Sequence, residues 1–158
     1  QLTGTIPNFD NFPNLTICEL GDNQLSGLIP NFDKLPMLVQ LGLFNNQLTG
    51  SVPNFDNLQN LVWLIIHSNF LTGSIPNFEK MPKLDYLDIE DNQLTGPIPN
   101  FTNLPKLRVL GLRKNKLSGT VPNFEYLPEL TFLGLSDNQL ISEIPNFYNM
   151  PKLNVLYL

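Results

Sequence analysis

The chain has 158 residues, of which 42% are hydrophobic and 15% are charged, and its formal net charge is −5. This length fits a single domain, and the negative charge argues against nucleic acid or an anionic membrane as a partner, because both attract basic surfaces. Fourteen prolines and the lack of alanine argue against a helical bundle. The only cysteine, Cys18, excludes an internal disulfide and any multi-cysteine metal site. We expect no insertion into a membrane, because no apolar run approaches the ~18 residues that cross a bilayer.

The sequence repeats itself with a period of 23 residues. The tetrapeptide Ile/Val-Pro-Asn-Phe begins at Ile6, Ile29, Val52, Ile75, Ile98, Val121 and Ile144. With Leu15 as position 1, each unit reads L-x-x-L-x-L-x-x-N-x-L-x-G-x-I-P-N-F-x-x-L-P-x. Because the whole chain obeys this pattern, we predict one domain over residues 1–158, made of about seven repeats without caps.

Each repeat begins with a predicted short strand. Positions 4 and 6 are apolar in every copy, and a spacing of two places both side chains on one face of a strand. Position 4 is Cys18, Leu41, Leu64, Leu87, Leu110, Leu133 and Leu156. Together with positions 1, 11, 15, 18 and 21, this gives apolar side chains that one repeat cannot bury alone and stacked repeats can. The pattern therefore predicts a solenoid.

The rest of the repeat predicts turns rather than helices. An asparagine at position 9 follows the strand, and its carboxamide can satisfy backbone groups of its own and neighbouring coils. A second asparagine, after the first proline, is expected to cap a turn, and the phenylalanine that follows it is expected to stack into a spine on the convex side. Two prolines in the segment before the next strand favour 3₁₀ turns or extended backbone over an α-helix.

The motif N-x-L-T/S-G-x-I/V-P, as in residues 46–53 and 92–99, resembles the plant-specific subclass of leucine-rich repeats. The resemblance implies a right-handed superhelix in the α/β, β-rich class. It also implies a parallel sheet on the concave face, a 3₁₀ or extended convex side, and a small second sheet around the Leu-Thr-Gly segment. Members are mostly extracellular recognition modules, such as receptor ectodomains and inhibitors of wall-degrading enzymes, so the implied location is secreted or cell-surface.

Two departures from that subclass matter for the source of the chain. The plant repeat is usually one residue longer, and the cysteine-paired caps of plant members are not found here. A bacterial or protist surface protein with tandem repeats fits these features as well. We also expect Leu2 and Leu158 to pack against further repeats or an adjacent subunit, because the ends of an uncapped solenoid expose its core.

The side chains between the strand leucines are predicted to line the concave face, where repeat proteins usually bind their partners. The candidate binding residues are Phe44, Trp63, Ile65, His67, Tyr86, Asp88 and Phe132. They include the only tryptophan, and exposed aromatic residues are typical interface anchors. The leading interpretation is a non-enzymatic scaffold that recognises a protein or a glycan. The alternative for the same residues is ordinary cross-strand packing.

Charged residues of neighbouring repeats are predicted to face one another. Aligned by position, Asp85 meets Arg108, Glu90 meets Arg113, and Asp91 meets Lys114. Charge-complementary rows explain this pattern without a ligand. A Ca²⁺ site at Asp88 and Glu90 is the alternative, but calcium takes about six oxygens.

The sequence offers little for catalysis, and we expect neither an enzyme nor a cofactor. His67 is the only histidine, and Ser68 follows it without a third partner in view. Cys18 replaces a core leucine, so we expect a buried, inert thiol. No phosphate-binding glycine loop occurs in the sequence.

Two further functions remain open from the sequence. Exact periodicity and bare ends suggest a structural element in which solenoids stack end to end into a rod or filament. A row of Thr and Ser at position 12 suggests ice binding, although position 14 is too mixed to complete a flat surface. The sequence also contains two glycosylation sequons, at Asn14 and Asn100.

Overall fold

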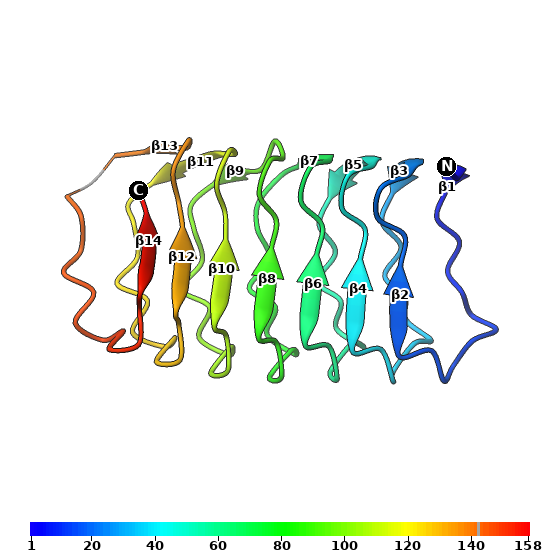
Figure 1. Cartoon of the computed structure of the whole chain (residues 1–158), viewed down its shortest axis with the longest axis horizontal. Helices are drawn as coiled ribbons and strands as arrows, with labels where there is room; N and C mark the ends of the chain where they lie inside the picture. The colour runs from blue at the N-terminus through cyan, green and yellow to red at the C-terminus, as the bar shows by residue number, and fades with distance from the viewer. Residues whose placement is uncertain (142) are drawn as a thin grey trace.

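The computed structural model describes residues 1–141 and 143–158 and shows a solenoid (Figure 1). Each complete coil contributes two short strands, one to each of two sets. One set of strands consists of β2 (Ile17–Glu19), β4 (Gln40–Gly42), β6 (Trp63–Ile65), β8 (Tyr86–Asp88), β10 (Val109–Gly111), β12 (Phe132–Gly134) and β14 (Val155–Tyr157). The other set consists of β1 (Thr3–Thr5), β3 (Gln24–Leu28), β5 (Gln47–Ser51), β7 (Phe70–Thr72), β9 (Thr95–Gly96), β11 (Lys116–Gly119) and β13 (Gln139–Leu140). The predicted short strand in each repeat is confirmed, and it covers positions 3–5, so position 6 lies just after its end.

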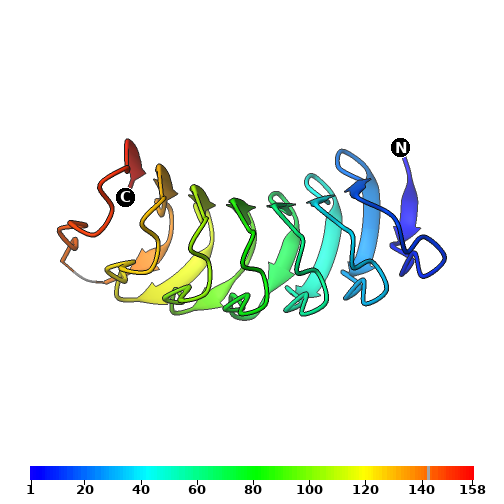
Figure 2. The ribbon, with the colours of Figure 1, turned by 90° about the horizontal axis from the view of Figure 1, so that it is seen from below.

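The first set forms one seven-stranded parallel sheet in the order β14-β12-β10-β8-β6-β4-β2. Its register equals the repeat, so that Leu64 pairs with Leu87 and Leu87 with Leu110. The coils follow a shallow arc, and this sheet lies on its concave side (Figure 2). Equivalent side chains of successive repeats therefore form straight rows across the concave face.

The Leu-Thr-Gly segments form two smaller parallel sheets, β1-β3-β5-β7 and β13-β11-β9. The interruption lies between β7 and β9, although the Gln93 N–H still donates to the Leu71 carbonyl and the Thr95 N–H to the Gly73 carbonyl, both at 2.8 Å. Gly96 within β9 has a φ of +81°, a conformation that disfavours other residues. The resemblance implied a second small sheet, and the structure contains this sheet in two parts.

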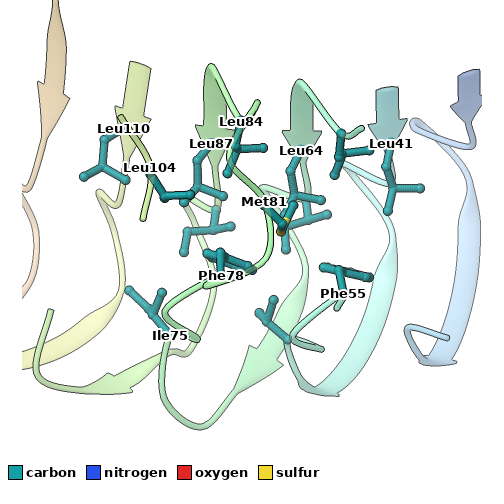
Figure 3. Close-up of a cluster of buried hydrophobic side chains, with 14 of the residues drawn as sticks. Leu41, Phe55, Leu64, Ile75, Phe78, Met81, Leu84, Leu87, Leu104 and Leu110 are labelled. Atoms are coloured by element: carbon teal, nitrogen blue, oxygen red, sulfur yellow. The ribbon is translucent and has the colours of Figure 1, made fainter. Parts of the chain in front are cut away.

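The interior is a continuous apolar core to which every coil contributes. In the central repeats the side chains at positions 1, 4, 6, 11, 15, 18 and 21 are buried, and Figure 3 shows those of Leu64, Phe78, Met81 and Leu87 pointing into the same interior. Burying one large apolar side chain contributes about 1.5–3 kcal/mol. The packing of coil against coil therefore supplies most of the stability, as the repeat pattern predicts.

The asparagines at position 9 form the predicted polar row inside the solenoid. The Asn69 amide donates from Nδ2 to the carbonyl oxygen of Leu43 in the preceding coil at 3.0 Å and to that of Ile66 in its own coil at 3.2 Å. Its Oδ1 accepts the backbone N–H of Leu48 at 3.0 Å. No buried side-chain nitrogen or oxygen of the described residues lacks a hydrogen-bond partner. Each asparagine thus ties two coils together where the strand ends.

The convex segment is built from isolated turns. In the central coil Met81 N–H donates to the Phe78 carbonyl and Leu84 N–H donates to the Met81 carbonyl, both at 3.1 Å. These are the bonds of a 3₁₀ turn, but none of the described residues forms a helix, and so none forms one that could cross a lipid bilayer. The expectation of turns and extended backbone instead of an α-helix is confirmed.

The phenylalanine at position 18 adopts a left-handed backbone conformation in all seven repeats, with φ between 49° and 56°. This conformation is unusual for a bulky residue. It turns the ring into the core, where Phe32, Phe55 and Phe78 are about 1% exposed. The rings of Phe32 and Phe55 stack with centroids 6.5 Å apart. The predicted stacking is therefore present among Phe9, Phe32 and Phe55, and it uses a strained backbone that the sequence did not reveal.

Candidate binding site

The concave face carries three rows of side chains, at positions 3, 5 and 7 of the repeat. Trp63, Tyr86, Val109 and Phe132 are consecutive members of the first row. Ile65, Asp88, Gly111 and Gly134 are consecutive members of the second row. The third row, just after the strands, contains Phe44, His67, Glu90, Arg113 and Ser136. Unlike the core positions, these rows change from one coil to the next.

The aromatic half of this face lies on β4, β6 and the turns after them. Trp63 is 43% exposed and pairs in register with Tyr86 on β8. Phe44 and His67 stack with their ring centroids 5.2 Å apart and their planes at 23°. Ile65 is half-buried between the two rows. The structure thus brings Phe44, Trp63, Ile65, His67 and Tyr86 together on one surface, as the sequence predicts.

Beside this surface lies a hollow of about 250 Å³, which we call the trough. It is lined by Tyr86, Asp88, Glu90, Val109, Gly111 and Phe132. Gly111 forms its floor, since a residue without a side chain leaves space there. Tyr86, Val109 and Phe132 form one wall because they are consecutive in one row. Phe132 is therefore grouped with Tyr86 across Val109 and not with Trp63.

Two carboxylates lean over the floor of the trough. A Cβ atom placed on Gly111 would lie 3.1 Å from Asp88 Oδ1 and 3.1 Å from Glu90 Oε1. Burial raises the pKa of Asp88, although the Glu90 backbone N–H, donating at 3.1 Å, and His67 oppose the rise. Burial and the charge of Asp88 raise the pKa of Glu90, against the opposing charge of Arg113. The carboxylates of Asp88 and Glu90 therefore carry negative charge in a partly desolvated environment.

The predicted charge pairs form in one case of three. Arg108 Nε donates to Asp85 Oδ1 at 2.6 Å, and its Nη2 bonds the second oxygen, as expected. Arg113 does not form an ion pair with Glu90 but donates from Nε to Ser136 Oγ at 2.9 Å. Its guanidinium lies 4.8 Å from the centroid of the Tyr157 ring. The expected pair between residues 91 and 114 is not among the ion pairs of the described residues either.

The candidate groups for metal binding and catalysis are arranged unfavourably for both. No group of three or more His, Cys, Asp or Glu side chains that could hold a metal occurs among residues 1–141 and 143–158. His67 Nδ1 lies 3.1 Å from Ser68 Oγ, and that hydroxyl donates to Asp91 at 3.3 Å. In a catalytic triad the carboxylate orients the imidazole, whereas here it bonds the hydroxyl. Burial raises the pKa of the Cys18 thiol to about 11, which disfavours the reactive thiolate.

Sequence reasoning missed the trough as a unit. It placed Tyr86, Asp88 and Phe132 among the candidate binding residues and named Glu90 only as a Ca²⁺ ligand or a charge partner, and it did not single out Gly111 or the wall residue Val109. The available signal was the run of Gly111 and Gly134 directly after Asp88 in the second row, because two small residues beside large ones create a hollow. The role of all these residues in binding stays a prediction.

Parallel coils of 23 residues with an inward asparagine row make the chain a parallel β-solenoid, and comparison with known proteins identifies its family. A family model of two leucine-rich repeats matches residues 105–149, and a single leucine-rich repeat model matches residues 83–104. A chain of the BIR3–SERK2 complex from Arabidopsis thaliana is 34% identical, with a TM-score of 0.71, and the match covers 80% of our chain and 70% of that one. The chain belongs to the leucine-rich repeat family.

Two other solved structures show the range of similar proteins. The structure of the Arabidopsis receptor kinase HAESA in complex with the peptide hormone IDA and the co-receptor SERK1 has a TM-score of 0.92 at 37% identity, and the match covers 99% of our chain and 27% of that chain. InlP from Listeria monocytogenes has a TM-score of 0.76 at 41% identity, covering 87% and 38%. Our chain thus spans little more than a quarter of the receptor chain. Curated protein sequences give no significant match.

Proposed function

We propose that this chain is a non-enzymatic recognition module that binds an extended protein segment across its concave sheet. The observation that carries the proposal is Trp63, which is 43% exposed on the interior strand β6 of that sheet and pairs in register with Tyr86 on β8. Exposed aromatic anchors next to a hollow are typical of binding hot spots. Similar proteins support the choice of ligand, since the HAESA structure contains a peptide hormone and a co-receptor.

A solenoid suits this function because its stability and its recognition surface use different residues. The core positions are nearly invariant, so they hold the fold whatever the concave rows contain. The rows at positions 3, 5 and 7 can then vary from coil to coil and match successive side chains of one partner. The parallel register presents these rows at a spacing of roughly 5 Å per strand.

The test is a selection followed by measured affinities. A displayed library of random linear peptides is selected on the immobilised chain, and the Kd of each enriched peptide is measured against the chain and its variants. Trp63→Ala combined with Tyr86→Ala should weaken binding at least about tenfold, because truncating a hot spot costs 2 kcal/mol or more. Tyr126→Ala is the matched control, since that ring is 44% exposed on the convex segment.

The proposal fails if the enriched peptides bind the concave variant and the parent with equal affinity. A glycan array read in parallel covers the other ligand class. If a glycan binds and loses its affinity with the same double variant while no peptide enriches, the surface is a sugar site and the protein proposal is wrong.

We also propose that the protein is secreted or displayed at a cell surface. The similarity to a peptide-hormone receptor supports this location. So do the side chains of Asn14 and Asn100, which begin the two sequons and are exposed to solvent.

A further inference from the structure

We propose that the trough between β8, β10 and β12 binds a cationic side chain, an arginine or a lysine, of the protein segment that lies on the concave sheet. This inference rests on the proposed function and names the chemistry of its partner. It is argued from the shape of the trough, the unpaired charges in it and the aromatic rings beside it.

The first argument is charge complementarity. Asp88 and Glu90 both lie over Gly111, and neither takes part in an ion pair within 4.0 Å in the part of the chain that the structure describes. Two like charges in a partly desolvated hollow repel each other, and each also loses hydration. A cation placed between them compensates both the repulsion and the lost hydration. Neutral hydroxyl groups of a sugar would compensate these charges less completely.

The nearest cation, Arg113, does not neutralise the trough by an ion pair. Its stem lies beside the Glu90 carboxylate, since a Cβ atom on Gly134 would lie 3.0 Å from Arg113 Cδ and 2.9 Å from Glu90 Oε1, and its charge lowers the pKa of Glu90. It forms no ion pair with Glu90 within 4.0 Å, and its guanidinium instead donates to Ser136 and lies against the Tyr157 ring. That contact also shows that this face accommodates a guanidinium against an aromatic ring.

The walls of the trough fit the remainder of such a side chain. Tyr86 and Phe132 are two strands apart in one row, which is about 10 Å, and Val109 lies between them. An aliphatic stem can pack on Val109 while the charged end meets the carboxylates and the edge of a ring. The volume of about 250 Å³ is smaller than the ~300–1,000 Å³ of sites for drug-sized ligands, so it suits a side chain better than a cofactor.

Binding should depend on pH in a defined direction. The titratable groups that line the trough are Tyr86, Asp88 and Glu90. The charges that act on its two carboxyl groups from neighbouring coils are those of His67, Arg113 and Lys114. Because the pKa values of Asp88 and Glu90 are raised, they become protonated at a higher pH than ordinary carboxyl groups. Affinity for a cation should therefore fall as the pH is lowered through the acidic range.

The test uses two short probes that differ only in charge. The peptide acetyl-Gly-Arg-Gly-amide and its citrulline counterpart are titrated into the ¹⁵N-labelled chain, and backbone amide shifts are followed by NMR. The arginine peptide should give saturable shifts at Val109, Gly111 and Gly134, with at least tenfold weaker binding of the citrulline peptide. Equal binding of the two peptides, or no saturable shift at these amides, overturns the inference.

Variants locate the effect in the trough. Asp88→Asn combined with Glu90→Gln should weaken binding of the arginine peptide at least tenfold, whereas Glu19→Gln, in the same row as Asp88 at the far end of the sheet, should leave it unchanged. Gly111→Val fills the floor without requiring a new backbone conformation and should abolish the shifts. An equal loss with Glu19→Gln would mean that only net charge matters and would refute the site.

The outcome is separable from that of the proposed function. If peptides selected on the chain depend on Trp63 and Tyr86 but bind equally well when each arginine is replaced by citrulline and each lysine by norleucine, the concave face binds proteins and the trough inference is wrong. If the arginine probe saturates at the trough while selected peptides ignore Trp63, the trough inference stands and the wider face has been assigned wrongly.

Discussion

Polar groups in the core of this solenoid are hydrogen-bonded within the chain, whereas, among the residues that the structure describes, charged groups on its concave face are left without an ion-pair partner. In the core, the amide of Asn69 is buried, and both its nitrogen and its oxygen are hydrogen-bonded within two coils. On the face, the carboxylates of Asp88 and Glu90 are partly buried, lie together over Gly111, and have raised pKa values. The core groups stabilise the free chain, whereas the face groups hold charge at a cost to it. Such a cost in the stability of the free chain is typical of residues that serve ligand binding.

The largest expected effect comes from removing one core amide. Asn69→Ala leaves the backbone N–H of Leu48 without its partner inside the protein, whereas the carbonyl of Leu43 still accepts a hydrogen bond from Asn46 Nδ2 at 3.1 Å. An unsatisfied buried group costs about 1–3 kcal/mol, so we expect the free energy of unfolding to fall by about 2 kcal/mol. Urea denaturation at pH 7 measures this loss.

Asn77→Ala is the control for that substitution, because Asn77 follows the proline of the next convex segment and is exposed. We expect it to change the free energy of unfolding by less than about 1 kcal/mol. Equal losses for the two variants would show that the asparagine row is not what joins the coils, and the contrast between core and face would lose its basis.

A smaller effect of opposite sign is expected on the face. Asp88→Asn keeps an oxygen that can accept the Glu90 N–H but removes the buried charge, so the free chain should gain about 0.5 kcal/mol at pH 7. A raised pKa favours folding below the unfolded value of 3.8, and this contribution is lost as the pH rises through the folded pKa. Unfolding of the parent and the variant at several pH values should therefore show the gain at neutral pH and its loss in acid.

Glu19→Gln provides the comparison for Asp88→Asn, because Glu19 occupies the same repeat position and is exposed. It should leave the pH dependence of stability unchanged. If Asp88→Asn destabilises the chain at pH 7, the carboxylate supports the fold and the cost that we assign to it does not exist.

The contrast between the core and the concave face also determines how much of the structure could be predicted from the sequence. The 23-residue period, the strands, the buried leucines and the asparagine row were all predictable, because each repeated residue has one environment in every coil. The residue types at positions 3, 5 and 7 differ from coil to coil, so the surroundings of each side chain depend on which neighbouring side chain it contacts. Arg113 lies at the same spacing from Glu90 and from Ser136, and the sequence could not show that it contacts the second.

Backbone strain was the other feature beyond the reach of the sequence. The left-handed conformation at Phe78 and its equivalents occurs because the turn must direct a large ring inward, and aromatic residues have no preference for that conformation. A pattern of apolar residues shows that a side chain is buried, but not the dihedral angles that bury it. The trough was missed for a similar reason, since its shape depends on how the side chains of Asp88 and Glu90 are placed around Gly111.

A second effect as small as that of Asp88→Asn is expected at the boundary between core and face, at position 8. Here too the backbone is left-handed, with φ of 52° at both Asp91 and Lys114. Aspartate and asparagine tolerate this conformation better than lysine does. Lys114→Asn should therefore raise the free energy of unfolding by about 0.5 kcal/mol. Lys106→Asn controls for the loss of an exposed charge, because Lys106 has no positive φ, and it should give no gain. Equal changes would assign the effect to charge rather than to backbone strain, and position 8 would then belong with the freely variable face.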